Sequence, residues 1–209
     1  LRDPLTRQSV KINDRFVLQY NGELYNSSIQ HNDTLFVASL IERYQDDIPK
    51  AIREMEGEFA YTIFDKQCEK LYFGRDAIGK RSLSYKFDSE TSKLFISSVS
   101  GTSEGFENCE GGTIYIYDSK TGNLEDDLRI RDVPYIVSCS IDEEMCQLNE
   151  NIELLFNELS EAVCRRVESI HPLHRENTPI SILFSGGLDC SVIAALICEQ
   201  IIKSGSDTV

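Results

Sequence analysis

Several features are missing from this 209-residue sequence, and each absence argues against a class of protein. No apolar run approaches the roughly 20 residues that a membrane-spanning helix needs. The seven cysteines include no C-x-x-C pair and no zinc-ligand spacing, so we expect no metal site of that kind. Basic residues are few: 21 lysines and arginines stand against 35 acidic residues, giving a net charge of -14. That charge disfavours binding to nucleic acid or to an anionic membrane.

The remaining composition is that of a soluble globular protein, with 41% hydrophobic and 27% charged residues. The cysteines are odd in number and scattered, and no secretory signal is visible, which predicts a reducing, cytoplasmic location. The length suffices for one domain and part of another. The chain begins with Leu1 and ends just after a predicted helix, so we expect a fragment cut at both ends. The oligomeric state cannot be derived from the sequence.

Hydrophobic periodicity divides the chain into an α+β domain at 1–131, a linker at 132–150 and the start of an α/β domain at 151–209. The linker is acidic and lacks clear periodicity. The second domain opens with an amphipathic helix whose apolar face spans 152–167. In the first domain we expect helices at 33–44 and 48–55, and strands at 15–20, 59–64, 71–73, 82–87, 94–99, 113–117 and 128–131. Short strands at this spacing predict stacked antiparallel sheets.

The segment Ile180–Asp189 predicts a buried strand, then a glycine turn and then a helix. Its apolar run suits a strand covered on both faces. Gly186 and Gly187 would let the backbone approach a bound group closely, and the free amides of a helix N-terminus favour an anion. A plain strand-turn-helix junction, with glycines only for packing, is the alternative interpretation.

The order S-G-G-L-D resembles the pyrophosphate loop of ATP pyrophosphatases, and no P-loop or G-x-G-x-x-G motif is present. The resemblance implies ATP with Mg²⁺ and an ATP-binding set of Leu183, Ser185, Gly186, Gly187 and Asp189. Asp189 would lie near the magnesium or cap the helix; no metal ligand is assigned. The sequence departs from the usual S-G-G-x-D-S pattern because Cys190 occupies the last position, and a thiol is a poorer hydrogen-bond donor than a hydroxyl.

A second motif, N-G-E-L-Y-N at 21–26, predicts by itself only a hairpin turn. It resembles a segment of class II glutamine amidotransferases. The helix start at Asp33, G-E-F-A at 57–60 and G-R-D-A-I-G-K-R-S-L at 74–83 resemble further segments of that family. In this order, and followed by S-G-G-L-D, the motifs resemble the glutamine-hydrolysing asparagine synthetase family, particularly its asparagine synthetase domain-containing branch.

The resemblance implies an Ntn-hydrolase-like αββα sandwich followed by an ATP-pyrophosphatase domain. It implies hydrolysis of glutamine to ammonia, and ATP-dependent amidation of aspartate through β-aspartyl-AMP. Asn21 and Gly22 would form the oxyanion hole, and Glu23 and Asp33 would join them in binding glutamine. Asp33 could instead be only a helix cap.

The nucleophile of the resembled family is an N-terminal cysteine, whereas residue 1 here is leucine. We therefore expect the 209-residue chain to have no glutaminase activity. Arg2 is the available substitute for the arginine that binds the substrate carboxylate in the family, and Arg75 and Asp76 are assigned structural roles. Three alternatives stay open: another acceptor, as in β-lactam synthetase-like relatives; a non-catalytic scaffold or regulatory protein; and a sulfur- or nitrogen-inserting RNA modifier.

Overall fold

A computed structural model of the chain describes residues 6–29, 32–101, 103–131, 141–170 and 180–203. The chain divides into two compact units, Leu1–Val133 and Pro134–Val209, and each is described by itself. Among the described residues, no helix combines the length and the apolar character that crossing a membrane would require.

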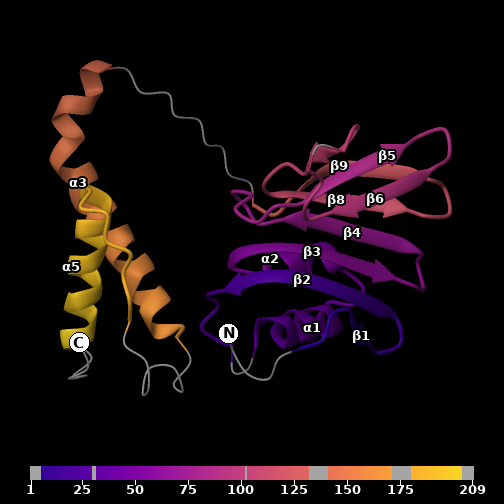
Figure 1. Cartoon of the computed structure of the whole chain (residues 1–209), viewed down its shortest axis with the longest axis horizontal. Coiled ribbons are helices and arrows are strands. Elements are labelled where there is room, and N and C mark those ends of the chain that lie inside the picture. The colour runs from indigo at the N-terminus through magenta and orange to yellow at the C-terminus, as the bar shows by residue number, and fades with distance from the viewer. Residues whose placement is uncertain (1–5, 30–31, 102, 132–140, 171–179, 204–209) are drawn as a thin grey trace. The chain divides into compact units, whose positions relative to one another are not determined.

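Unit 1 is built on a six-stranded antiparallel sheet (Figure 1) with the order β1-β2-β3-β4-β8-β9. Its longest pairing joins β2 to β3 and runs from Phe16 opposite Asp65 to Leu24 opposite Gly57. The strands are β1 (Val10–Ile12), β2 (Phe16–Leu24), β3 (Gly57–Asp65), β4 (Lys70–Arg75), β8 (Thr113–Asp118) and β9 (Asn123–Arg129).

A smaller sheet with the order β6-β5-β7 lies on one side of the large sheet (Figure 1). The apolar cluster between the sheets is centred on Phe73, whose ring stacks on that of Tyr115 with 5.0 Å between the ring centroids. The strands of the small sheet are β5 (Ser84–Asp88), β6 (Lys93–Ser97) and β7 (Glu107–Asn108).

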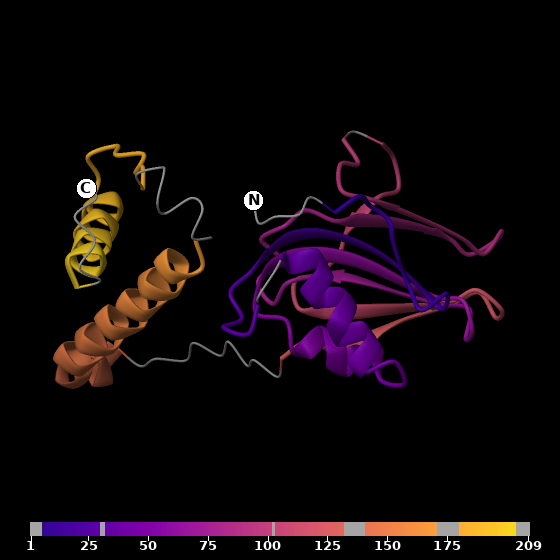
Figure 2. The ribbon, with the colours of Figure 1, turned by 90° about the horizontal axis from the view of Figure 1, so that it is seen from below.

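Two helices, α1 (Asp33–Arg43) and α2 (Ile48–Arg53), cover the other face of the large sheet (Figure 2). Asn32 caps α1 by accepting a hydrogen bond from the Leu35 amide, and Asp47 caps α2 with Pro49 following in its first turn. Both helices turn their apolar faces onto the main core, which alternate residues of β2 and β3 complete.

The helices and the seven strands predicted for unit 1 are found, but two short strands, β1 and β7, were not predicted, and β2 continues beyond its predicted end to Leu24. β9 begins at Asn123, earlier than predicted. The expected αββα sandwich is only partly found: within the described part of unit 1, the layers are helices, large sheet and small sheet, without a second helical layer over the small sheet.

Unit 2 contains α3 (Ile141–Glu168) and α5 (Leu188–Lys203), which contact each other. Val163 of α3 and Leu196 of α5 are buried there, at 8% and 3% exposure. The apolar face predicted for α3 is largely uncovered, with Leu155 68% exposed and Phe156 51% exposed. Residues 141–150, predicted as linker, are helical, because α3 begins earlier than its apolar periodicity indicates.

The predicted strand at 180–184 is wrong. This segment has no regular secondary structure and Leu183 is 98% exposed. A parallel strand needs hydrogen-bonding neighbours on the same sheet, and the described residues of unit 2 contain none. The helix after the glycines is confirmed as α5.

Candidate functional site

The N-G-E-L segment lies inside β2 and forms no turn. Asn21 is opposite Ala60 of β3, and Gly22 is opposite Phe59. A Cβ at Gly22 would lie 2.3 Å from the Glu58 carbonyl oxygen, so only glycine allows the two strands to approach this closely. The hairpin interpretation of Asn-Gly fails because the strand pairing continues through both residues.

The amide of Gly22 points to the outer edge of β2, away from β3. Amides two residues apart on a strand point to the same side. On that side the Tyr20 amide donates to Gln8 Oε1 at 3.1 Å, and the Leu24 amide donates to Asp33 Oδ2 at 3.3 Å. The Gly22 amide lies between them, and β1 pairs with β2 only as far as Leu18. The Gly22 amide therefore faces away from β3, and its role in an oxyanion hole stays a prediction.

Asp33 is brought to the end of β2 by the start of α1. Its carboxylate accepts the Leu24 amide, one residue after Glu23. The cap of α1 is Asn32, whose Oδ1 accepts the Leu35 amide at 2.8 Å. The interpretation of Asp33 as the helix cap is thus wrong, and its carboxylate instead joins the helix start to the N-G-E segment.

Glu23 lies directly opposite Glu58 of β3. Like charges in such a pair are destabilising, and two cations from the loop after β4 offset them. Arg81 Nη2 donates to Glu58 Oε1 at 3.0 Å, and Lys80 forms an ion pair with Glu58 Oε2. Two carboxylates and two cations therefore gather beside Asn21.

The Tyr20 hydroxyl belongs to the same group. Burial is the main cause that raises the pKa of Tyr20 well above its ordinary value. The negative charges of Asp33 and Glu23 raise this pKa further, and the positive charge of Arg81 partly opposes them. The hydroxyl therefore stays protonated, and it is buried without a hydrogen-bond partner in the described part of the chain. The charges of Glu23, Asp33 and Arg81 all act on this one group.

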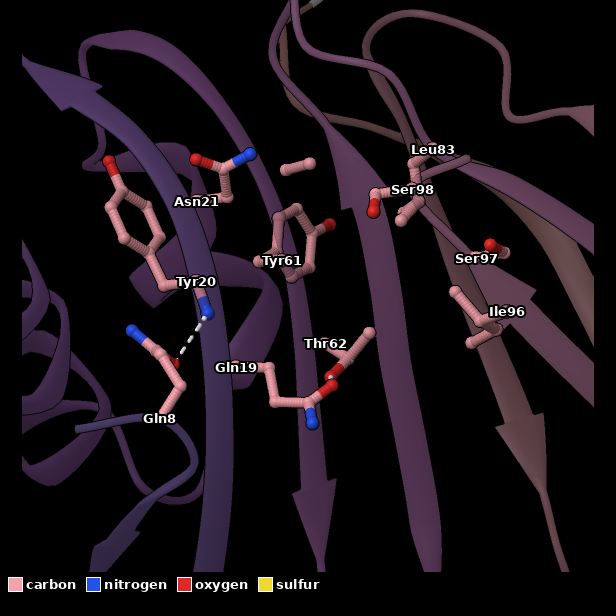
Figure 3. A pocket seen from close by; sticks show the side chains of 11 residues that line it. Gln8, Gln19, Tyr20, Asn21, Tyr61, Thr62, Leu83, Ile96, Ser97 and Ser98 are labelled. Atoms are coloured by element: carbon pink, nitrogen blue, oxygen red, sulfur yellow. Dashed lines mark hydrogen bonds between the residues drawn. The ribbon is translucent and has the colours of Figure 1, made fainter. Parts of the chain in front are cut away.

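A cavity of about 390 Å³ opens beside Asn21, between the large and the small sheet. Among the described residues, its lining side chains carry no charge and combine amides and hydroxyls with apolar groups. Figure 3 shows Gln19 and Thr62 side chains pointing toward each other, with Leu83 and Ser98 facing them from the other side. The lining residues are Gln8, Gln19, Tyr20, Asn21, Ala60, Tyr61, Thr62, Leu83, Ile96, Ser97 and Ser98.

The structural roles predicted for Arg75 and Asp76 are confirmed. The buried Asp76 carboxylate accepts the amides of Phe59, Ile78, Lys80 and Arg81 at 3.0–3.2 Å. Arg75 Nη1 donates to the carbonyl oxygens of Gly79 and Arg81 at 3.0 and 3.3 Å. These contacts fix the loop that presents Lys80 and Arg81.

The glycine loop of unit 2 fits a phosphate group in part. Gly186 has φ +83°, and no atom lies within 4 Å of the position that a Cβ would take there. The loop leads into α5, whose N-terminus favours an anion. Ser185, Gly187 and Asp189 are exposed around it, as is Leu183. The described residues contain no group of three His, Cys, Asp or Glu side chains that could hold a metal, so Mg²⁺ would depend on the phosphates themselves.

Cys190 lies in the first turn of α5, next to this loop. Its thiol donates to the Gly187 carbonyl oxygen at 3.1 Å and lies 3.5 Å from Ser185 Oγ. The hydrogen bond with the Ser185 hydroxyl is the main cause that lowers the pKa of Cys190. Burial raises this pKa, and the backbone amides of the loop lower it further. Ser191 Oγ donates to the same carbonyl oxygen at 2.8 Å, so neither side chain supplies the expected hydroxyl to an incoming phosphate.

Known proteins resemble this chain, and a family match covers most of unit 1. Residues 2–102 match the family described as glutamine amidotransferase domain. An asparagine synthetase domain-containing protein of Saccharomyces cerevisiae is 48% identical over 203 residues, which is 95% of this chain and 38% of the yeast protein. Glutamine-hydrolysing asparagine synthetase 2 of Arabidopsis thaliana is 27% identical over 198 residues, 88% of this chain and 31% of that protein.

Among solved structures, a glutamine phosphoribosylpyrophosphate amidotransferase from B. subtilis aligns with 59% of the chain and 31% of its own length, at 20% identity and a TM-score of 0.46. The family match defines unit 1 as a glutamine amidotransferase domain. The chain belongs to the asparagine synthetase family, among the asparagine synthetase domain-containing proteins. It spans about 38% of the length of the yeast relative.

The structure thus brings Asn21, Gly22, Glu23 and Asp33 together, and the roles assigned to them stay predictions. Arg2 lies outside the described residues. No sequence pattern indicated Arg81, or the cavity residues of β3 and β6, as site residues. The strand register places Glu58, which Arg81 contacts, opposite Glu23, although the two glutamates are 35 positions apart in the chain.

Proposed function

We propose that unit 1 contributes the glutamine-binding site of a longer enzyme, which liberates ammonia from the glutamine carboxamide and uses ATP to amidate aspartate through β-aspartyl-AMP. The single observation that carries the proposal is the convergence of Asn21, Gly22, Glu23 and Asp33 at the end of β2, beside a cavity whose described lining residues carry no charge. Glutamine has a neutral carboxamide at one end and a charged α-amino acid group at the other. The site is divided in the same way: the described cavity lining is uncharged, whereas the carboxylates of Glu23 and Asp33 lie at the end of β2.

The chemistry assigns each group a task. Attack on the carboxamide builds negative charge on its oxygen, and donors that are already fixed stabilise this charge. The Asn21 side chain and the Gly22 amide are such donors. Glu23 and Asp33 would bind the α-ammonium group through charge-assisted hydrogen bonds. The nucleophile is not supplied by residue 1, which is leucine.

The ammonia acceptor would be activated where ATP binds, and the loop at 185–189 supports that step. Its open glycines and the helix start favour the pyrophosphate portion of MgATP. The predicted strand before the loop is not formed, so its apolar residues are exposed. For that reason we expect weak or no binding of MgATP to the 209-residue chain, and tight binding in calorimetry would contradict this.

The function is tested on the whole gene product that contains this chain. Glutamate and asparagine are measured with ATP, aspartate and either glutamine or ammonium as nitrogen donor. We expect Asn21→Ala to lower the glutamine-dependent rate about 100-fold or more and to leave the ammonium-dependent rate unchanged. Absence of both activities in a folded protein would contradict the proposal and favour a scaffold.

A further inference from the structure

The outer edge of β2 loses its strand partner before it reaches Gly22. β1 pairs with β2 from Ile12 to Val10, which lies opposite Leu18. If this antiparallel register continued toward the N-terminus, Thr6 would lie opposite Gly22. Residues 6–9 belong to no strand, so the pairing ends before that point.

Side-chain hydrogen bonds take the place of strand pairing on both sides of Gly22. Two residues before it, the Tyr20 amide donates to Gln8 Oε1 at 3.1 Å, as the dashed line in Figure 3 shows. Two residues after it, the Leu24 amide donates to Asp33 Oδ2 at 3.3 Å. Both bonds lie on the edge to which the Gly22 amide also points. They therefore restrain the strand on either side of this glycine.

A third side-chain hydrogen bond connects the first two. Asn32 Nδ2 donates to Thr6 Oγ1 at 2.7 Å, while Asn32 Oδ1 caps α1. Asn32 is buried, so water competes little for these bonds. Thr6 lies two residues from Gln8 in the chain, and Asn32 directly precedes Asp33. The three bonds therefore close a ring, here called the edge ring, which contains residues 6–8, 20–24 and 32–33.

The edge ring restrains a residue that has little stiffness of its own. Glycine has more backbone freedom than any other residue, and segments with few contacts open locally more readily than the core of a sheet. A donor stabilises a developing oxyanion best when its direction is fixed before the reaction. The edge ring holds the main chain on both sides of Gly22, and pairing with β3 holds the opposite edge.

We infer that Thr6, Asn32 and Gln8 are positioning residues for the oxyanion hole. Through the edge ring they hold the Gly22 amide in the direction that the carboxamide oxygen of glutamine requires in the transition state. This inference rests on the proposed function of unit 1. The three residues act through the main chain of β2 and not by contact with glutamine. Opening the ring should therefore lower kcat with little change in KM.

Thr6→Val tests the ring at a single bond, because valine is close to threonine in shape but offers no acceptor to Asn32. The cap of α1 and the bond from the Leu24 amide to Asp33 do not involve Thr6. The change is made in the whole gene product, and kcat and KM are measured for the formation of glutamate from glutamine. We expect kcat to fall about 10-fold and KM to stay within about twofold. Thr6→Ser keeps the hydroxyl and should restore kcat.

Ser39→Ala is the matched control, because it also removes one side-chain hydrogen bond of 2.7 Å, from Ser39 Oγ to the Phe36 carbonyl oxygen in α1. Its kcat should equal that of the parent protein. Amide hydrogen exchange of the 209-residue chain gives a second readout that needs no glutamine. The amides of Tyr20 and Leu24 should exchange about 10-fold faster in Thr6→Val than in the parent chain, and at the parent rate in Ser39→Ala.

The possible results separate the inference from the proposed function. Unchanged kcat in Thr6→Val, in an enzyme that hydrolyses glutamine, would overturn the inference and leave the proposed function standing. A higher KM with unchanged kcat, or unchanged exchange of the Tyr20 and Leu24 amides, would overturn it as well. If the parent enzyme does not hydrolyse glutamine, the proposed function fails and this role fails with it. Should Thr6→Val not fold, Gln8→Met opens the ring at the Tyr20 amide, and unchanged kcat there would refute the inference.

Discussion

Removal of the Asp76 carboxylate should destabilise unit 1 more than any other single loss of a side chain in the loop after β4. Asp76 is 1% exposed, and its two oxygens accept four backbone amides. One of these is the Phe59 amide of β3, which is itself buried. In Asp76→Ala the buried Phe59 amide loses its hydrogen-bond acceptor. The amides of Ile78, Lys80 and Arg81 lose a negatively charged acceptor.

The expected magnitude follows from these contacts. A buried amide without a partner costs about 1–3 kcal/mol, and each hydrogen bond to a charged group contributes about 1.5–3 kcal/mol. Some loop amides will be hydrated after the substitution, so we expect a loss of about 3–5 kcal/mol in the free energy of unfolding. That is a large share of the stability of a domain of this size. Asp76→Asn keeps one acceptor oxygen and should lose about half as much.

The measurement is urea unfolding followed by tyrosine fluorescence. The chain contains no tryptophan, and eight of its nine tyrosines precede Pro134, so this signal reports mainly on unit 1. The matched control is Asp118→Ala, because Asp118 also accepts two backbone amides but lies in an exposed turn where water can replace it. If both substitutions shift the unfolding midpoint equally, the account of Asp76 as a buried organiser of the loop is refuted.

Three further predictions concern other parts of the chain. Gly22→Ala should lower the stability of unit 1 by about 1–3 kcal/mol in the same unfolding assay, because the new Cβ would overlap the Glu58 carbonyl oxygen; unchanged stability would contradict the close approach of β2 and β3. Burial would raise the pKa of Asp65, but hydrogen bonds from Arg15 and two amides outweigh it and hold the pKa below its ordinary 3.8. The stabilisation by the Asp65 carboxylate is therefore complete above about pH 4 and is lost as the pH falls through the lowered pKa. In Asp65→Asn, stability should fall less steeply between pH 5 and pH 2 than in the parent chain. An equally steep fall would contradict this role of Asp65. Burial raises the pKa of Cys109 to about 12, whereas that of Cys190 is lowered, so iodoacetamide at pH 7.5 should label Cys190 well before Cys109 in mass spectrometry; the reverse order would show that one of the two environments is wrong.

Much of unit 1 could be predicted from sequence, because its elements are encoded locally. The change from helical spacing to alternation near Gly57 marks the first strand of a hairpin, and Asp47-Ile48-Pro49 marks a helix start. The Asn21-Gly22 pair could be assigned only through its neighbours in the chain. Taken alone it predicts a turn, and the register with β3 makes it strand.

The remaining features depend on contacts between distant segments. The cavity needs β2, β3 and β6 together, and no local pattern shows that Ser97 and Gln19 line the same space. The partnership of Asp33 with the Leu24 amide depends on the path of the chain between β2 and α1. The strand predicted at 180–184 failed for the opposite reason, since an apolar run forms a strand only where other strands pair with it.

Binding of L-glutamine to the isotope-labelled 209-residue chain, followed residue by residue in ¹H–¹⁵N spectra, tests the central claim most directly. The account predicts saturable shifts confined to the end of β2 and the start of α1, led by the amides of Gly22 and Leu24 and the side-chain amide of Asn21, and their loss in Asn21→Ala. Shifts confined to other parts of the chain, or none at saturating glutamine, would contradict it.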